Sequence, residues 1–283
     1  MSISATTSSA RPSRVQGRSR FFLIAVALAY VGLLLLAPIA GIVWTVIDGG
    51  SGVVRRSLAA PDVRHAFLLT GVITVMAVIV TAVFGVAVAM VLTRDRFPGR
   101  RLMSAIVDLP LAVSPVIVGL MAVLLFGRGG WFEPFFTARG IQIIFALPSM
   151  VLVTVFICIP FVVREVVPVL EEVGIEEVEA ARTLGASPTQ TFFRITLPTI
   201  RWGLLYGVAL TAARSLGEIG AVLIVSGTIQ GHTETATLYI FRALEERQEA
   251  SGYFVALVLA AGSIVLLTAI ELFKRKRVRE RSR

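Results

Sequence analysis

The chain has 283 residues, of which 56% are hydrophobic and only 16% are charged, and its formal net charge at pH 7 is +9. Soluble globular proteins carry about 25% charged residues, so the composition excludes a protein whose surface is mostly exposed to water. The positive charge alone would also suit a nucleic-acid-binding protein, but the basic residues lie at both termini and between apolar runs. That placement is typical of a membrane protein with a fixed orientation.

The first twenty residues are rich in serine, threonine and arginine and include no acidic residue, so we expect residues 1–20 to form a disordered basic tail. Six apolar runs follow, each long enough to cross a bilayer as a helix of about 20 residues. The first run is too long for the core of a signal peptide, which spans about 7–15 residues. The predicted transmembrane helices are Phe21–Ile47, Ala66–Leu92, Leu102–Phe126, Ile141–Val163, Trp202–Gly227 and Tyr253–Phe273.

These runs predict an all-α, polytopic membrane protein with one transmembrane domain, residues 21–273, and a second basic tail, residues 274–283. The lysines and arginines outside the spans divide unequally: 19 lie on the side of the two tails and 7 on the other side. Basic residues are enriched in cytoplasmic segments, so the sequence predicts that both termini are cytoplasmic.

The longest segment between two predicted spans, residues 164–201, has the local signals of two short helices joined by a tight turn. Gly185 suits the position just past the end of a first helix, where the backbone takes a positive φ. Ser187 followed by Pro188 and Gln190 fits the N-cap, N1 and N3 positions of a second helix, which is a capping box. We therefore expect a helix–turn–helix on the cytoplasmic side.

Seven residues of this segment reproduce a known signature, E-A-A-x3-G-x9-I-x-L-P: Glu179, Ala180, Ala181, Gly185, Ile195, Leu197 and Pro198. The segment thereby resembles the permease subunits of ATP-binding-cassette (ABC) importers. The resemblance implies the type I permease fold of that family. It also implies that the signature residues form coupling helices, which dock in a groove of the ATPase subunit.

The resemblance extends over nearly the whole chain, through the stretches that flank the signature: 93–99, 109–130, 159–170, 197–207 and 213–227. Together they resemble the W-type inner-membrane permeases of sulfate/thiosulfate importers, within the wider sulfate–molybdate–tungstate group. This implies an oxyanion importer subunit in the bacterial inner membrane. Its expected partners are a homologous second permease, two ATPase subunits and an external sulfate-binding protein. A molybdate or tungstate permease and a stand-alone secondary transporter are the alternatives.

Two charged residues, Arg214 and Glu218, fall inside the fifth predicted span, four positions apart and so on one helix face. A charge at the bilayer centre costs roughly 2.5–3.5 kcal/mol on insertion scales, so such residues face a partner or a water-filled cavity. One hypothesis is a structural ion pair. The other is that Arg214 and Glu218, with Thr211 and Ser215 on the same face, line the path of the anion.

Enzymatic chemistry finds little support in the sequence. The one cysteine, Cys158, and the two histidines, His65 and His232, lie in different segments and do not have metal-ligand spacing. A phosphate-binding P-loop needs Gly-Lys-Ser/Thr, whereas both lysines lie in the C-terminal tail. We therefore expect no metal, no cofactor and no catalytic residue, with ATP hydrolysed by a partner subunit.

The unequal distribution of basic residues gives a first test. Reporter fusions at Arg100, Ala186 and Lys276 should report a cytoplasmic location, because the side richer in lysine and arginine stays inside. Fusions at Arg56, Arg139 and Glu246 should report an external location. A cytoplasmic reading at Arg56 together with an external reading at Arg100 would overturn this topology.

Overall fold

The computed structural model describes residues 17–95 and 97–281, and within this part of the chain it contains helices and no strand. The all-α prediction is therefore confirmed. The elements in chain order are α1 (Gly17–Asp48), α2 (Gly50–Ala59), α3 (Pro61–Arg94), α4 (Arg100–Ala112), α5 (Pro115–Phe126), α6 (Glu133–Thr137), α7 (Leu147–Val173), α8 (Glu176–Thr183), α9 (Pro188–Thr191), the π-helical turn η1 (Phe192–Thr196), α10 (Leu197–Leu216), α11 (Gly220–Ser226), α12 (Ala236–Glu245) and α13 (Glu249–Arg281).

Among the described residues, four helices are long and apolar enough to cross a membrane: α1, α3, α7 and α13. Two further pairs, α4 with α5 and α10 with α11, meet the same criteria but are bent by 111° and 58°. Counting each bent pair as one span gives six, in agreement with the sequence. Two of the six predicted spans are therefore each broken into two helices.

The sharper bend interrupts the predicted span Leu102–Phe126 at Val113 and Ser114, whose backbones are extended (ψ 136° and 135°). Pro115 follows, and a proline disfavours the helical conformation of the residue before it. Because proline has no N–H, it also fits the first position of a new helix, which it takes in α5. The residues of one apolar run therefore form two helices.

The second bend lies in a short segment that we call the polar break, residues 217–219, between α10 and α11. The Glu218 carboxylate accepts a hydrogen bond from the Ala221 N–H at 2.9 Å, so this side chain caps the N-terminal end of α11. Gly220 lets α11 approach α5, since a Cβ there would lie 3.0 Å from the Pro115 Cβ. The two bent spans thus meet where each of them breaks.

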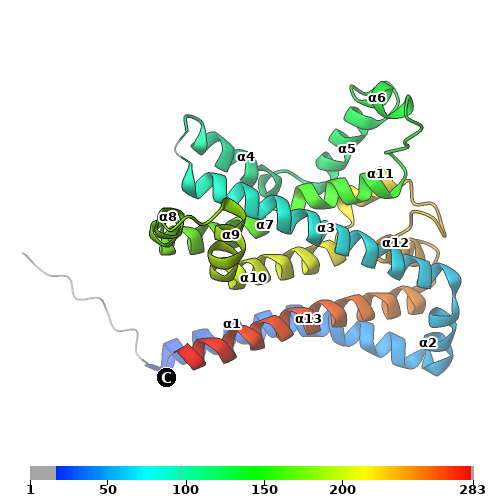
Figure 1. Cartoon of the computed structure of the whole chain (residues 1–283). Coiled ribbons are helices and arrows are strands. Elements are labelled where there is room, and N and C mark those ends of the chain that lie inside the picture. Colours follow the sequence, from blue (N-terminus) through cyan, green and yellow to red (C-terminus); the bar gives the residue numbers. More distant parts are fainter. Residues whose placement is uncertain (1–16, 96, 282–283) are drawn as a thin grey trace, which may run out of the picture.

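Three helices, α3, α7 and α10, pack against one another and form the centre of the molecule. Glycine makes this contact close: a Cβ on Gly207 of α10 would lie 2.8 Å from the Val162 Cα of α7, and one on Gly203 2.6 Å from the Glu165 carbonyl oxygen. Figure 1 shows α1 and α13 running side by side along one flank of this unit. The side chains of α1 are largely exposed, as suits a helix that faces lipid or another subunit.

The helices of the structure begin and end near the expected domain boundaries. Most of the expected N-terminal tail, residues 1–16, lies outside the described residues, and residues 17–20 already belong to α1. At the other end, α13 continues as a helix to Arg281. Because α7 extends to Val173 and α10 begins at Leu197, the segment between these spans is residues 174–196, shorter than the expected 164–201. We call residues 174–196 the signature turn.

Candidate functional site

The first half of the signature turn is α8, which ends in a Schellman motif. The Gly185 N–H donates to the Arg182 carbonyl and the Ala186 N–H to the Ala181 carbonyl, both at 3.0 Å. Gly185 has φ +85°, and a Cβ on it would meet no atom within 4 Å. The positive φ, and not a lack of room, is therefore what favours glycine here. The predicted end of the first short helix is confirmed.

The second half of the signature turn begins with the predicted capping box. The Gln190 N–H donates to the Ser187 hydroxyl at 3.3 Å, and the Ser187 N–H donates to the Gln190 side-chain oxygen at 2.9 Å. Pro188 takes the first helical position, where its missing N–H costs nothing. Sequence and structure agree on the start of α9.

The sequence did not predict how α9 continues. Instead of ending, it passes through the π-helical turn η1 into α10, so that the chain is helical from Pro188 to Leu216. The proline of the signature explains the wider turn. Pro198 has no N–H to donate to the Arg194 carbonyl four residues back, and in a regular helix its ring would clash with that carbonyl. A π turn relieves the clash, and the Leu197 N–H donates to the Phe192 carbonyl five residues back.

The signature turn presents apolar side chains on its exterior. Leu184 is 89% exposed and Phe193 62% exposed. Val178 is buried and lines a small cavity together with Ile195. Of the signature residues, Glu179, Ala180, Gly185 and Pro198 are exposed, and Ala181, Ile195 and Leu197 are half-buried. The turn therefore holds itself together on its inner side and leaves small and apolar groups free on its outer side.

At the polar break, Arg214 and Glu218 form an ion pair with 2.7 Å between Nη1 and Oε2. The Glu218 side chain is 2% exposed and that of Arg214 is 33% exposed. The carboxylate also accepts a hydrogen bond from the Ala221 N–H, whereas the Arg214 side chain is partly exposed. The pair thus combines a fixed, buried anion with a cation that a further group could approach.

Thr211 and Ser215, expected on the same face as this pair, are buried. The Ser215 hydroxyl donates to the Thr211 carbonyl at 2.8 Å and lies 3.7 Å from the Cys158 sulfur of α7. These contacts point into the packing between α10 and α7. In this conformation the accessible polar group of the set is Arg214.

Sequence reasoning missed the partners that reach the polar break from residues 233–237. The Thr237 hydroxyl donates to the Glu218 carbonyl at 2.8 Å. Nearby, Glu234 is 1% exposed and accepts two hydrogen bonds from Arg242, at 2.6 and 3.1 Å. This contact raises the pKa of the Arg242 guanidinium, because the carboxylate stabilises its charged form. Only the pairing of an acid with a base eight residues later could have suggested the contact.

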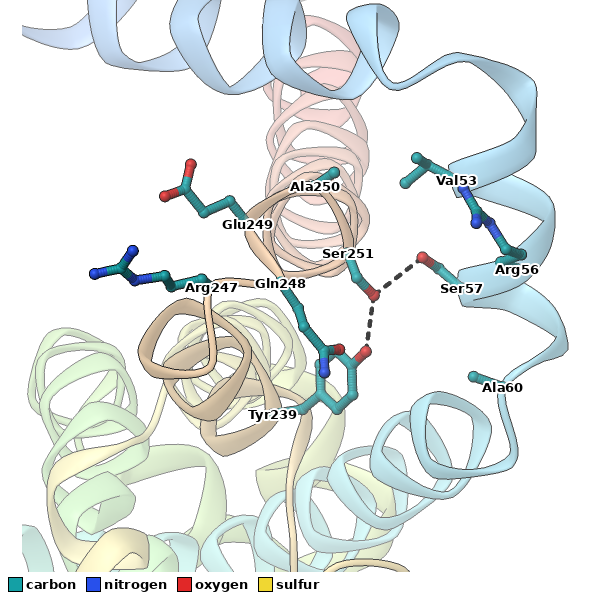
Figure 2. Close-up of a pocket in the computed structure, with 10 residues that line it drawn as sticks. All are labelled: Val53, Arg56, Ser57, Ala60, Tyr239, Arg247, Gln248, Glu249, Ala250 and Ser251. Atoms are coloured by element: carbon teal, nitrogen blue, oxygen red, sulfur yellow. Dashed lines mark hydrogen bonds between the residues drawn. The ribbon is translucent and has the colours of Figure 1, made fainter.

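The end of the molecule opposite the signature turn contains a pocket of about 470 Å³ between α2 and the α12–α13 corner (Figures 1 and 2). In its wall, the Ser251 hydroxyl lies 2.7 Å from the Tyr239 hydroxyl and 3.1 Å from the Ser57 hydroxyl. Figure 2 shows Arg247 and Glu249 pointing away from these hydroxyls. The charged groups do not converge, so the hydroxyl cluster serves to fasten α2 to α12 and α13.

Comparisons with known proteins identify the family of the chain. The sequence matches the family described as binding-protein-dependent transport system inner membrane component over residues 82–279. It is 44% identical over 257 residues to the sulfate transport system permease protein CysW of Synechocystis sp., covering 91% of this chain and 93% of that protein. It is 38% identical over 244 residues to the sulfate transport system permease protein CysT of Salmonella typhimurium, covering 86% and 88%.

Among solved structures, a chain of a bacterial alginate ABC transporter, crystallised in complex with an alginate pentasaccharide-bound periplasmic protein, has the same fold. The TM-score is 0.75 at 17% sequence identity, and the match covers 92% of this chain and 96% of that chain. At this identity the likeness concerns the fold alone.

Proposed function

The chain belongs to the family of binding-protein-dependent transport system inner membrane components, and we propose that it is a permease subunit of an ATP-driven sulfate importer. The proposed substrate, sulfate, rests on one observation: the chain is 44% identical, over nine tenths of its length, to a permease named for sulfate transport. The molybdate and tungstate alternative has no such support among the relatives reported above. A stand-alone transporter disagrees with the family, which depends on a binding protein.

The subunit works with partners. Its relative CysT is a second sulfate permease at 38% identity, which supports a heterodimer of this chain with a homologous permease. We propose that two ATPase subunits and an external sulfate-binding protein complete the importer. The chain itself is non-catalytic, and the ATPase subunits hydrolyse ATP.

The signature turn is the proposed docking element for the ATPase. Its exposed Leu184 and Phe193 would bury apolar surface in a groove of that subunit, and the exposed Ala180 and Gly185 would let the two backbones approach closely. Docking there requires the signature turn to be cytoplasmic. The C-terminal end of α13 lies at the same end of the molecule as α8 and α9, and α2 and α12 lie at the opposite end (Figure 1). This arrangement suits two cytoplasmic termini.

For the anion path we propose the polar break. Arg214 of α10, which pairs with Glu218 of this break and is 33% exposed, would attract a dianion where little water screens the charge. The buried Glu218 holds the guanidinium in place and lowers its net attraction, so that an anion can leave again. Thr211 and Ser215 would join the path only in a conformation that separates α10 from α7.

The direct test of this function is uptake of labelled sulfate by the complete complex, reconstituted in proteoliposomes with its second permease, ATPase and binding protein. We expect uptake that requires ATP, because the chain has no P-loop of its own and depends on its partner. Unlabelled sulfate should compete, and molybdate should compete poorly. Strong competition by molybdate with little by sulfate would contradict the assignment of substrate.

In the same assay, Gly185→Val should nearly abolish uptake while the protein still inserts. Valine strains the positive φ by about 1–2 kcal/mol and adds branched bulk to the docking surface. Gly185→Asn is the matched control, because asparagine tolerates this conformation and should retain most of the uptake. Normal uptake by Gly185→Val would mean that the ATPase docks elsewhere.

The polar break is tested by Arg214→Ala, Glu218→Ala and the double variant. Each single change leaves one charge without its partner, so we expect a modest loss of folded protein that the double variant partly restores. Uptake should fall strongly in all three, most of all where Arg214 is lost, because the attraction for the dianion is gone. Folded yield and sulfate uptake are measured side by side. Full recovery of uptake in the double variant would leave the pair a purely structural role.

A further inference from the structure

Arg94, the last residue of α3, contacts the signature turn from a distance of 102 positions in the sequence. Its Nη2 donates a hydrogen bond to the Thr196 hydroxyl at 2.8 Å, and Thr196 is 1% exposed. The buried threonines Thr81 and Thr154 donate instead to carbonyls of their own helices, four residues back. Thr196 is thus tied to another helix, at the last position of η1.

The contact between Arg94 and Thr196 lies at a joint between two helices. η1 is the joint between α9, which belongs to the proposed docking element, and α10, which carries Arg214. A π turn within a long α-helix is a point where such a helix bends. Arg94 reaches this joint from α3, which packs on α7 and α10 in the central unit. Arg94 therefore connects the π turn of the long helix to the central unit of α3, α7 and α10.

The ends of neighbouring elements meet around the same contact. A small cavity there is lined by Arg94 and Thr196, by Leu170 at the end of α7 and by Val178 of α8. The apolar side chains of Phe192 and Leu197, at the two ends of the joint, pack against the buried core between α3, α7 and α10. The hydrogen bond from Arg94 adds a directional restraint to this apolar packing, which by itself has no preferred direction.

We infer that Arg94 is a positioning residue for energy coupling. Its hydrogen bond to Thr196 stiffens η1. A displacement of the docked signature turn then moves α9, η1 and α10 together as one rigid helix, without bending at the π turn. This inference rests on the proposed function. It identifies Arg94, which lies outside the signature turn, as a residue that determines how much of the ATP-driven displacement is transmitted to the anion path.

The test is the number of sulfate ions transported per ATP hydrolysed by the reconstituted complex carrying Arg94→Ala or Thr196→Val. Valine keeps the branched shape of threonine but has no hydroxyl, so this variant removes the contact with little change in packing. We expect sulfate transported per ATP to fall about tenfold, within the range for residues that couple distant sites. ATP hydrolysis itself should stay close to wild type.

The double variant should lose no more than either single variant, because both remove the same contact. Arg101→Ala, which removes an exposed arginine on α4, is the control and should leave the ratio unchanged. If Arg94→Ala does not assemble, Thr196→Val decides the matter. Parallel loss of hydrolysis and transport, additive losses or an unchanged ratio in Thr196→Val would overturn the inference. Failure of the proposed function would appear instead as absent ATP-driven sulfate uptake by the wild-type complex.

Discussion

The structure depends on the continuity of one helix, residues 188–216, which joins the proposed docking element to the polar break. The continuity is possible because the π turn η1 accommodates Pro198, which a regular helix would tolerate poorly. Gly203 and Gly207 allow the helix to pack closely on α7. Such a helix can transmit a displacement of the signature turn to the polar break.

Glu218, two residues beyond the end of this helix, serves both structure and electrostatics. It lies in the polar break, caps α11 and pairs with Arg214 on α10. Tilting α10 would change the geometry of that pair, because α11 packs mainly against α5, whereas α10 packs mainly against α7 and α3. A displacement of the signature turn would therefore change the electrostatics of the Arg214–Glu218 pair.

Much of this could be predicted from the sequence, because the signals were local. Apolar runs gave the spans, and the chemistry of Gly185 and Ser187 gave the ends of the short helices. Pro115 also indicates a bend at Ser114, but the length of the apolar run favoured one span over residues 102–126. The contact of Arg94 with Thr196 and that of Glu234 with Arg242 depend on packing between elements, which a single sequence does not specify.

The rigidity of the helix at residues 188–216 is tested most directly by the distance between two spin labels, at Thr189 and Leu205, both of which are exposed. The labels are placed in a Cys158→Ala chain within the full complex. Sixteen helical residues separate them by about 24 Å. This distance should be the same without nucleotide and with ATP bound, while the distance from Thr189 to a label at Leu33 of α1 changes. A change between Thr189 and Leu205 with α10 fixed relative to α1 would show that η1 bends, and would contradict the account.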